Sequence, residues 1–195
     1  MMFITLSLYK YLMTVHVYHG TNSKILDRIR QNRAISPFKD PIIENARTGA
    51  IQAVKLAGAT EYRARMLERR PSIYVASKSS VAESYGVCSP EMLITALNLL
   101  KTYDPQKARE IIDLLEADGW MEVKPLVLKL EIFGPAELGL PTSLVLEEGQ
   151  LDGLFGATNE RRLDGELPIE RIVDVTEIST EHMFLRTILR ILGQE

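Results

Sequence analysis

The spacing of apolar residues changes along this chain, and that change constrains the fold more than any other feature of the sequence. From Pro125 onward apolar and polar residues alternate, with Leu126, Leu128, Leu130 and Ile132 on one side and Lys129 and Glu131 on the other. Val127 keeps the second side partly apolar, which predicts a β-strand covered on both faces. Elsewhere apolar side chains recur every three or four residues, the period of an amphipathic helix. Because the two patterns interleave without internal repeats, we expect a single α+β domain.

Shorter segments also have the composition or the alternation of strands. The β-branched and aromatic residues of Thr14–Tyr18 and Ser72–Ser77 predict two strands. Three further strands are expected at Ser143–Leu146, Thr158–Leu163 and Ile172–Ile178. These segments supply the remaining members of a sheet around the strand that begins at Pro125.

Helices are predicted between and after these strands. Asn22 or Ser23 is expected to cap a helix that ends near Asn32 and has one apolar face, formed by Ile25, Leu26 and Ile29. Another helix is expected from about Ser79 to Tyr85. A last amphipathic helix is expected at the C-terminal end, with an apolar face of Phe184, Ile188, Ile191 and Leu192.

Two longer stretches, 44–70 and 90–118, also have helical periodicity and resemble insertions into the core. The second is expected in two pieces, because Asp104-Pro105 provides a cap and a first-turn proline. Gly119 closes it. Basic residues crowd the end of the first stretch: Arg63, Arg65, Arg69 and Arg70. We interpret them first as side chains that complement a helix dipole, and only second as contacts for nucleic acid.

The composition excludes several classes of protein. The 195 residues are 46% hydrophobic and 25% charged, enough for one compact soluble domain. A formal net charge of −3 lacks the basic footprint of a dedicated nucleic-acid binder. Cys88 is the single cysteine, so an internal disulfide framework and a cysteine-rich zinc site are excluded. With three histidines (His16, His19 and His182), a histidine-based metal site is not expected either.

The first thirteen residues, Met1–Met13, form an apolar segment. It is too short to span a membrane and contains Lys10, and it lacks the basic start and the cleavage site of a signal peptide. It is either an extra edge strand or translated sequence upstream of a true start at Met13. We expect a cytoplasmic protein that does not bind a membrane.

The common nucleotide-binding and hydrolase motifs are missing: the chain has no G-x-G-x-x-G after a strand, no G-x-x-x-x-G-K-[ST] and no G-x-S-x-G. Three short segments hold the chemically interesting residues instead. The segment VYHGTNSKILDRIRQNRAIS contains His19, expected at the end of a strand, and IYVASKSSVAESY contains Tyr74 and Tyr85. The segment TNERRLDGELPIERIVDV contains Glu160. Taken singly, each has a simpler interpretation: a lone histidine at a strand end is more often structural than catalytic, Tyr74 is consistent with a core residue, and Glu160 is consistent with a solvated strand residue.

Together these segments resemble the ADP-ribosyltransferase superfamily, in its branch with a His–Tyr–Glu triad that includes diphtheria toxin and the poly(ADP-ribose) polymerases. His19-Gly20-Thr21 is similar to the family's first strand, Ile73–Ala76 with Tyr85 to its tyrosine strand and following helix, and Glu160 to its glutamate strand. The resemblance spans about residues 14–178 in the family's order. It implies an ADP-ribosyltransferase-like split β-sheet core with helical insertions.

The resemblance also implies roles for these residues in cleaving the nicotinamide–ribose bond of NAD+, which would be a substrate used without a metal. His19 would hydrogen-bond a ribose hydroxyl, and Tyr74 and Tyr85 would stack on the nicotinamide ring. The Gly20 backbone would pair with the carboxamide, and Thr21 would also belong to the NAD+-binding residues. Glu160 would stabilise the positive charge that develops on the ribose. We expect His19, Gly20, Tyr74 and Tyr85 to face a common pocket, with His19, Tyr74 and Glu160 as the catalytic set.

The sequence departs from related branches and leaves alternatives open. His19 replaces the arginine of the arginine-triad branch, and Thr158 stands where arginine-modifying members have a second glutamate. The acceptor of ADP-ribose is expected to be a macromolecule, a protein more readily than a nucleic acid. The biological role is left open among a toxin, an effector, a phage-encoded modifier and a housekeeping enzyme. The alternatives are an NAD+ glycohydrolase, an RNA 2′-phosphotransferase or a non-catalytic binding module.

Glu160 and Glu166 compete for the role of the catalytic carboxylate. We favour Glu160, because a strand residue is held more firmly than Glu166, which follows the Asp164-Gly165 turn. Tyr74 is expected to be well buried, since it lies between Ile73 and Val75. Tyr85 is expected to need its ring rather than its hydroxyl to bind nicotinamide, so that Tyr85→Ala weakens binding more than Tyr85→Phe.

Overall fold

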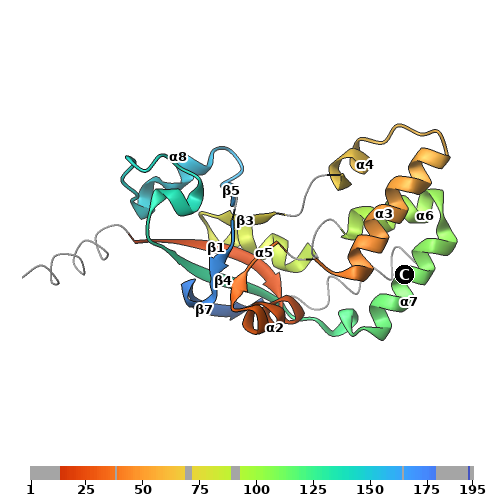
Figure 1. Ribbon diagram of the computed structural model, residues 1–195, viewed down its shortest axis with the longest axis horizontal. Coiled ribbons are helices and arrows are strands. Elements are labelled where there is room, and N and C mark those ends of the chain that lie inside the picture. Colours follow the sequence, from red (N-terminus) through yellow and green to blue (C-terminus); the bar gives the residue numbers. More distant parts are fainter. Residues whose placement is uncertain are drawn as a thin grey trace, which may run out of the picture.

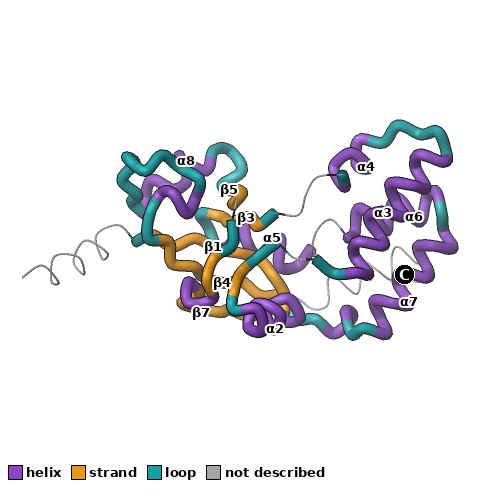
Figure 2. Tube along the Cα trace, viewed as in Figure 1, coloured by secondary structure: helices purple, strands orange, loops and turns teal. Residues whose placement is uncertain are grey.

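The computed structural model describes residues 14–37, 39–68, 72–88, 93–163, 165–178 and 193. The expected segment Met1–Met13 and the expected C-terminal helix lie outside these residues. Figure 1 shows two lobes, one built around a β-sheet and the other from helices α3, α4, α6 and α7. Figure 2 separates them by element type, with the strands confined to the first lobe. The fold is therefore α+β, as the periodicities predict.

The sheet lobe contains a five-stranded antiparallel sheet in the order β5-β3-β1-β4-β7. Its strands are β1 (Val15–Asn22), β3 (Ile73–Ala76), β4 (Pro125–Ile132), β5 (Glu160–Leu163) and β7 (Ile172–Glu177). A second sheet pairs two short strands, β2 (Ala34–Ile35) and β6 (Leu167–Pro168). The N-terminal strand thus lies at the centre of the main sheet, and the glutamate strand β5 lies at one edge.

Pairing between β1 and β4 runs from Val15↔Ile132 to Asn22↔Pro125 without interruption. Side chains alternate across this pair, so Val17 and Leu130 point to the same face and are both buried. The other face of β4 carries Val127, which is buried as well. The prediction that this strand is covered on both faces is therefore confirmed.

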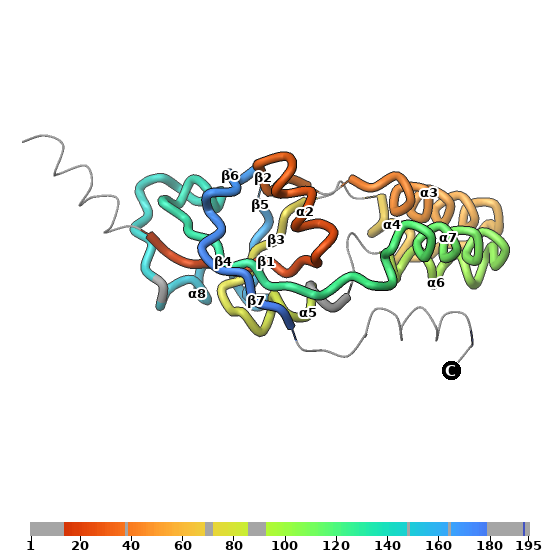
Figure 3. Tube along the Cα trace, turned by 90° about the horizontal axis from the view of Figure 1, so that it is seen from below, coloured from red at the N-terminus to blue at the C-terminus, as the bar shows by residue number. Residues whose placement is uncertain are grey.

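Helices cover the two faces of the sheet. Helix α2 (Ser23–Asn32) follows β1 directly and buries its predicted apolar face of Ile25, Leu26 and Ile29. Asn22 caps it by accepting a hydrogen bond from the Ile25 amide at 3.0 Å. Helix α5 (Ser79–Cys88) packs on the opposite face, where Ala82 meets Ala76 and Val127. Figure 3 shows α2 and α5 on either side of β1.

The outer end of the sheet lobe is closed by short helical turns. Four of these elements are η3 (Pro135–Leu138), η4 (Glu148–Gln150), α8 (Leu151–Phe155) and η5 (Ile169–Arg171). Leu138, Leu151 and Phe155 join the main core beneath the sheet. The guanidinium of Arg171 lies 3.7 Å from the centre of the Phe133 ring and pairs with Glu137, which fixes η5 against the end of β4.

The helical lobe combines two separate chain segments. The first contributes α3 (Pro41–Leu56) and α4 (Tyr62–Leu67), and the second contributes α6 (Leu93–Tyr103) and α7 (Pro105–Ala117). Their apolar faces meet around a small-residue stripe on α3 (Ala46, Ala50 and Ala53) and the leucines of α6. Asp104 caps α7 by accepting from the Lys107 amide at 3.1 Å, as predicted.

The two lobes are joined where α7 returns to the sheet through η2 (Trp120–Glu122). Trp120 is fully buried, and the ammonium group of Lys24 on α2 lies 5.3 Å from the centre of its ring. The same ammonium group pairs with Asp118 at 2.7 Å. The hydrophobic core runs from the sheet into the helical lobe without a break.

Four expectations about elements are wrong. The stretch 44–70 is not one helix, because Gly58 adopts a left-handed conformation (φ 64°) and separates α3 from α4. The expected strand at Ser143–Leu146 is a turn followed by irregular backbone. Strand β1 continues beyond Tyr18 to Asn22, so His19 lies inside a strand rather than at its end.

The fourth concerns the arginines. Because α4 starts at Tyr62, Arg63 lies in the first turn of that helix and cannot complement the dipole at its C-terminal end. Arg65 is in the last turn, as expected. Arg69 and Arg70 lie outside the described residues. Across the part of the chain that the structure describes, no helix is both long and apolar enough to cross a membrane.

The packing of α7 gives a direct test of the helical lobe. Ile111 is fully buried, whereas Leu114 on the same helix is 45% exposed. We expect Ile111→Ala to lower the free energy of unfolding by about 2–5 kcal/mol, because it removes buried methyl groups and leaves a cavity. Leu114→Ala should change that energy by less than about 0.5 kcal/mol. Urea unfolding followed by circular dichroism measures both, and equal losses would contradict this packing.

Candidate functional site

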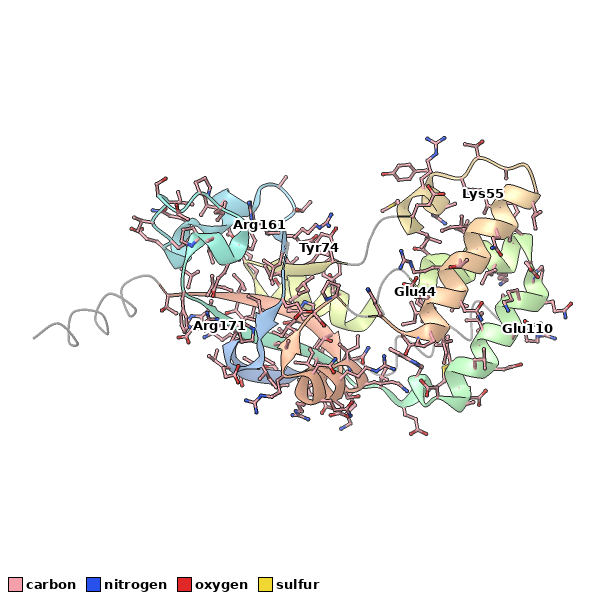
Figure 4. The ribbon with its side chains drawn as sticks, in the orientation of Figure 1. Glu44, Lys55, Tyr74, Glu110, Arg161 and Arg171 are labelled. Atoms are coloured by element: carbon pink, nitrogen blue, oxygen red, sulfur yellow. The ribbon has the colours of Figure 1, made fainter. Side chains whose placement is uncertain are left out.

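Three adjacent strands hold three of the residues that the sequence singles out. His19 lies on β1, Tyr74 on β3 and Glu160 on β5, and these strands are neighbours in the order β5-β3-β1. Neighbouring strands are about 4.8 Å apart, so the outer two of these strands are separated by about 10 Å. Figure 4 shows Tyr74 at the end of β3 that lies nearest the helical lobe. Segments far apart in the chain therefore meet on neighbouring strands.

His19 contacts the backbone of Tyr74. Its Nδ1 atom lies 2.8 Å from the Tyr74 carbonyl oxygen. A carbonyl oxygen can only accept, so Nδ1 carries the proton in this contact. Burial lowers the pKa of His19 below its ordinary value of 6.5, and the hydrogen bond to Tyr74 opposes this shift only in part. The imidazole is therefore neutral at pH 7, and its Nε2 atom is a hydrogen-bond acceptor.

The pairing of β1 with β3 explains this contact. Tyr18 is opposite Ala76, and continuing that register sets Gly20 opposite Tyr74. The pleat turns Tyr74 toward the α5 face of the sheet, whereas His19, paired with Leu128 on β4, belongs to the other face. The imidazole therefore contacts β3 through a backbone atom only. The expectation that the side chains of His19 and Tyr74 face a common pocket is wrong, because strand alternation turns them to opposite faces of the sheet. Because Gly20 has no side chain, nothing from that residue covers the sheet in front of Tyr74.

Glu160 and Tyr85 are in direct contact. Glu160 is opposite Ala76 in the β3–β5 pair, so its side chain lies on the same face as Tyr74. Helix α5 packs on this face and carries Tyr85, whose hydroxyl donates a hydrogen bond to Oε1 of Glu160. Tyr85 is 44% exposed and Tyr74 is 43% exposed. Two tyrosines and one carboxylate therefore line an accessible part of this face.

The expectation that Tyr74 is well buried is wrong. Its neighbours Ile73 and Val75 are buried in the main core, but strand alternation turns Tyr74 away from that core. The face that it joins is covered only in part by α5. Flanking apolar residues therefore indicate the burial of β3 as a strand and not the burial of each residue in it.

The backbone before Glu160 is held by contacts that sequence reasoning missed. The Ser77 amide donates to the Asn159 carbonyl at 3.0 Å, and Asn159 adopts a left-handed conformation (φ 54°). Asp152 on α8 accepts from the Ser77 hydroxyl and pairs with Lys78 at 2.7 Å. Hydrogen bonds from Lys78 and then Ser77 lower the pKa of Asp152 below its usual range. Asparagine tolerates left-handed backbone, and this was the available sequence signal for the turn.

Arg161 fixes the other side of the same strand. Its guanidinium donates to the carbonyl oxygens of Leu138 and Gly139, which lie at the end of η3. Figure 4 shows Arg161 on the part of the sheet lobe next to α8. Backbone contacts on both sides therefore set the position of β5, while Tyr85 contacts the carboxylate of Glu160.

Thr21 differs from the expectation for a ligand-binding side chain. It is only 4% exposed, and its hydroxyl oxygen has no hydrogen-bond partner among the described residues. A ligand could reach this position through the backbone, but the side chain faces the core beside Leu126. The candidate contact at Thr21 is thus limited to main-chain atoms.

Glu166, the rival carboxylate, lies in a different place. It is exposed and lines a groove of about 470 Å³ formed largely by the C-terminal half of α2 and the residues around β2. The groove is lined by Ile25, Arg28, Ile29, Asn32, Ala34, Ser36, Pro37, Lys39 and Glu166. Neither Tyr74 nor Tyr85 lines this groove, so the structure groups the tyrosines with Glu160 and separates them from Glu166.

Within the described residues, no group of three or more histidine, cysteine, aspartate and glutamate side chains is arranged to hold a metal ion. Comparison with models of known families, with curated proteins and with solved structures found no match.

The state of His19 gives a prediction about stability and pH. Because the pKa of His19 is lowered in the folded protein, the unfolded chain takes up a proton at higher pH than the folded one. The contribution of neutral His19 to stability is therefore complete above about pH 6.5 and falls as the pH drops toward the folded pKa. We expect the difference in unfolding free energy between wild type and His19→Gln to shrink from pH 7.5 to pH 5. A difference that is constant over this range would contradict the lowered pKa.

Proposed function

We propose that this protein is an NAD+-dependent ADP-ribosyltransferase that uses Glu160, His19 and Tyr74 to cleave the nicotinamide–ribose bond. The observation that carries the proposal is that Tyr74, Tyr85 and Glu160 gather on one face of the sheet, while His19 contacts the Tyr74 backbone from the neighbouring strand. His19 binds the backbone of Tyr74, and Tyr85 binds Glu160, which is held opposite Ala76 on the neighbouring strand. Residue types in the same chain order characterise the His–Tyr–Glu branch of that superfamily, which the sequence resembles.

Glu160 has the chemistry that this reaction needs. Breaking the N-glycosidic bond of NAD+ releases neutral nicotinamide and leaves a ribose with oxocarbenium character. A carboxylate close to the sugar, bound to its 2′-hydroxyl, stabilises the positive charge as it develops. Asn159 and Arg161, the neighbours of Glu160, are fixed by hydrogen bonds, which favours a constant position for the carboxylate.

The two tyrosines suit a site for the nicotinamide ring. Both are partly exposed although they are large aromatic residues, and both belong to the face of the sheet that carries Glu160. Offset stacking of aromatic rings contributes about 0.5–1.5 kcal/mol beyond the burial of surface. The backbone of Gly20, which the register sets opposite Tyr74, would receive the carboxamide.

His19 suits recognition of a ribose hydroxyl. With Nδ1 donating to the Tyr74 carbonyl, Nε2 of the neutral imidazole is left to accept from a hydroxyl group. Protonation would convert Nε2 into a donor. The proposed contact therefore requires the neutral imidazole that burial favours.

The helical lobe offers a surface for the acceptor. It is composed of the two segments that interrupt the core. The first leads into β3, which carries Tyr74, and the second follows α5, which carries Tyr85. A macromolecular acceptor bound to this lobe would contact segments that are next to the Tyr74 and Tyr85 elements in the chain. We propose a protein acceptor ahead of a nucleic acid, in keeping with the net charge of −3.

Incubation of the purified protein with NAD+ labelled in the adenylate part and a whole-cell lysate tests the proposal. Labelled macromolecules are the expected result. Free ADP-ribose alone would instead favour an NAD+ glycohydrolase. If neither product forms, the transferase proposal is wrong and a non-catalytic binding module becomes the better interpretation. Transfer of a phosphate from 2′-phosphorylated RNA to NAD+ would identify the phosphotransferase alternative.

Substitution of the two glutamates tests which carboxylate acts. We expect Glu160→Gln to lower turnover of NAD+ by about 10²–10³-fold or more while NAD+ binding and the melting temperature stay close to wild type, because only the charge needed in the transition state is lost. Glu166→Gln is the matched control and should have little effect, since Glu166 lines the separate groove beside α2. If Glu166→Gln abolishes turnover and Glu160→Gln does not, the choice of carboxylate is wrong.

A further inference from the structure

The hydroxyl of Tyr85 has a partner that ring stacking does not require. It donates a hydrogen bond to Oε1 of Glu160. Helix α5 and strand β5 are far apart in the chain, and they are brought together because both pack against β3. The contact joins the residue proposed to stack on nicotinamide to the residue proposed to stabilise the ribose.

Two kinds of contact act on Glu160. Some hold its chain neighbours in place, and one is made by its own carboxylate. The strand is positioned by the Ser77 amide on Asn159 and by the guanidinium of Arg161 on Leu138 and Gly139. These contacts do not fix the side-chain torsions of Glu160. Tyr85 does so, because a donor bound at one carboxylate oxygen restricts the rotation of the whole group. The second oxygen, Oε2, is then left to accept from a ribose hydroxyl.

We infer that Tyr85 is a positioning residue for Glu160 as well as a stacking residue, an inference that rests on the proposed function. Its ring would pack on nicotinamide while its hydroxyl holds the carboxylate toward the ribose. Since one side chain performs both tasks, the Tyr85 conformation that stacks on the nicotinamide ring also orients the Glu160 carboxylate. The hydroxyl of Tyr85 acts on the rate of bond cleavage through Glu160, and the ring acts on the binding of NAD+.

A purely structural role explains the contact less well. Tyr85 is 44% exposed, and hydrogen bonds between exposed groups add little to the stability of a fold. Glu160 begins β5 at the edge of the sheet, where the backbone is already fixed. Removal of the hydroxyl should therefore change turnover far more than it changes folding.

The experiment is steady-state turnover of NAD+ by wild type, Tyr85→Phe and Tyr85→Ala. Tyr85→Phe keeps the ring and removes the donor, so we expect kcat to fall by about 10–100-fold while KM for NAD+ stays within about twofold. Tyr85→Ala should lower kcat and also raise KM, since stacking is lost. Tyr62→Phe is the matched control, because Tyr62 is exposed on α4 in the other lobe. With NAD+ and no macromolecular acceptor in the assay, it should leave kcat, KM and the melting temperature unchanged.

The outcomes separate this inference from the proposed function. If wild type consumes NAD+ and Tyr85→Phe matches its kcat, the positioning role is wrong while the transferase proposal survives. If Tyr85→Phe raises KM and spares kcat, the hydroxyl binds substrate and does not orient Glu160, which also overturns the inference. If Tyr85→Phe lowers the melting temperature so far that unfolding accounts for the lower kcat, the hydroxyl acts in folding, and the inference is also overturned. If wild type itself consumes no NAD+, the proposed function fails and the inference fails with it.

Discussion

The antiparallel pairing of β1 with β4 is the constraint on which the rest of the structure depends. It places the N-terminal strand at the centre of the main sheet, and β3 and β7 then extend the sheet on either side. The register is fixed because Val15 and Val17 must share the buried face with Ile132 and Leu130. A slip of one residue would exchange the faces of every side chain on β1, including His19. The chemistry proposed for this protein therefore depends on ordinary core packing.

The helical lobe is tied to the site by the path of the chain. The chain leaves the sheet after β2, passes through α3 and α4, and returns as β3 with Tyr74. It leaves again after α5, which carries Tyr85, and returns through α7 and η2 as β4. Packing between α3 and α6 thus helps to set the ends of the two elements that present the tyrosines. The lobe is part of the same continuous core and not an appendage.

Much of the secondary structure could be predicted, because local spacing and capping chemistry decide it. The sequence predicts three such features: the alternation in β4, the asparagine cap of α2 and the Asp104-Pro105 start of α7. Errors arose where longer-range contacts compete with local preference. Ser143–Leu146 is apolar enough for a strand, but Leu146 is buried in the main core without joining a sheet. Tyr74 was misjudged because alternation, and not its neighbours, decides its exposure.

The sequence by itself determined which residue types are available for chemistry and their order along the chain: a histidine, two tyrosines and a glutamate in separate elements. Only the tertiary structure decided how they meet. Contact of Nδ1 with the Tyr74 carbonyl and of the Tyr85 hydroxyl with Glu160 depends on sheet order and on which face α5 covers. The local spacing of residues does not predict these two contacts, because strand order and helix packing are set by burial across the whole core. The separation of Glu166 from the tyrosines has the same origin.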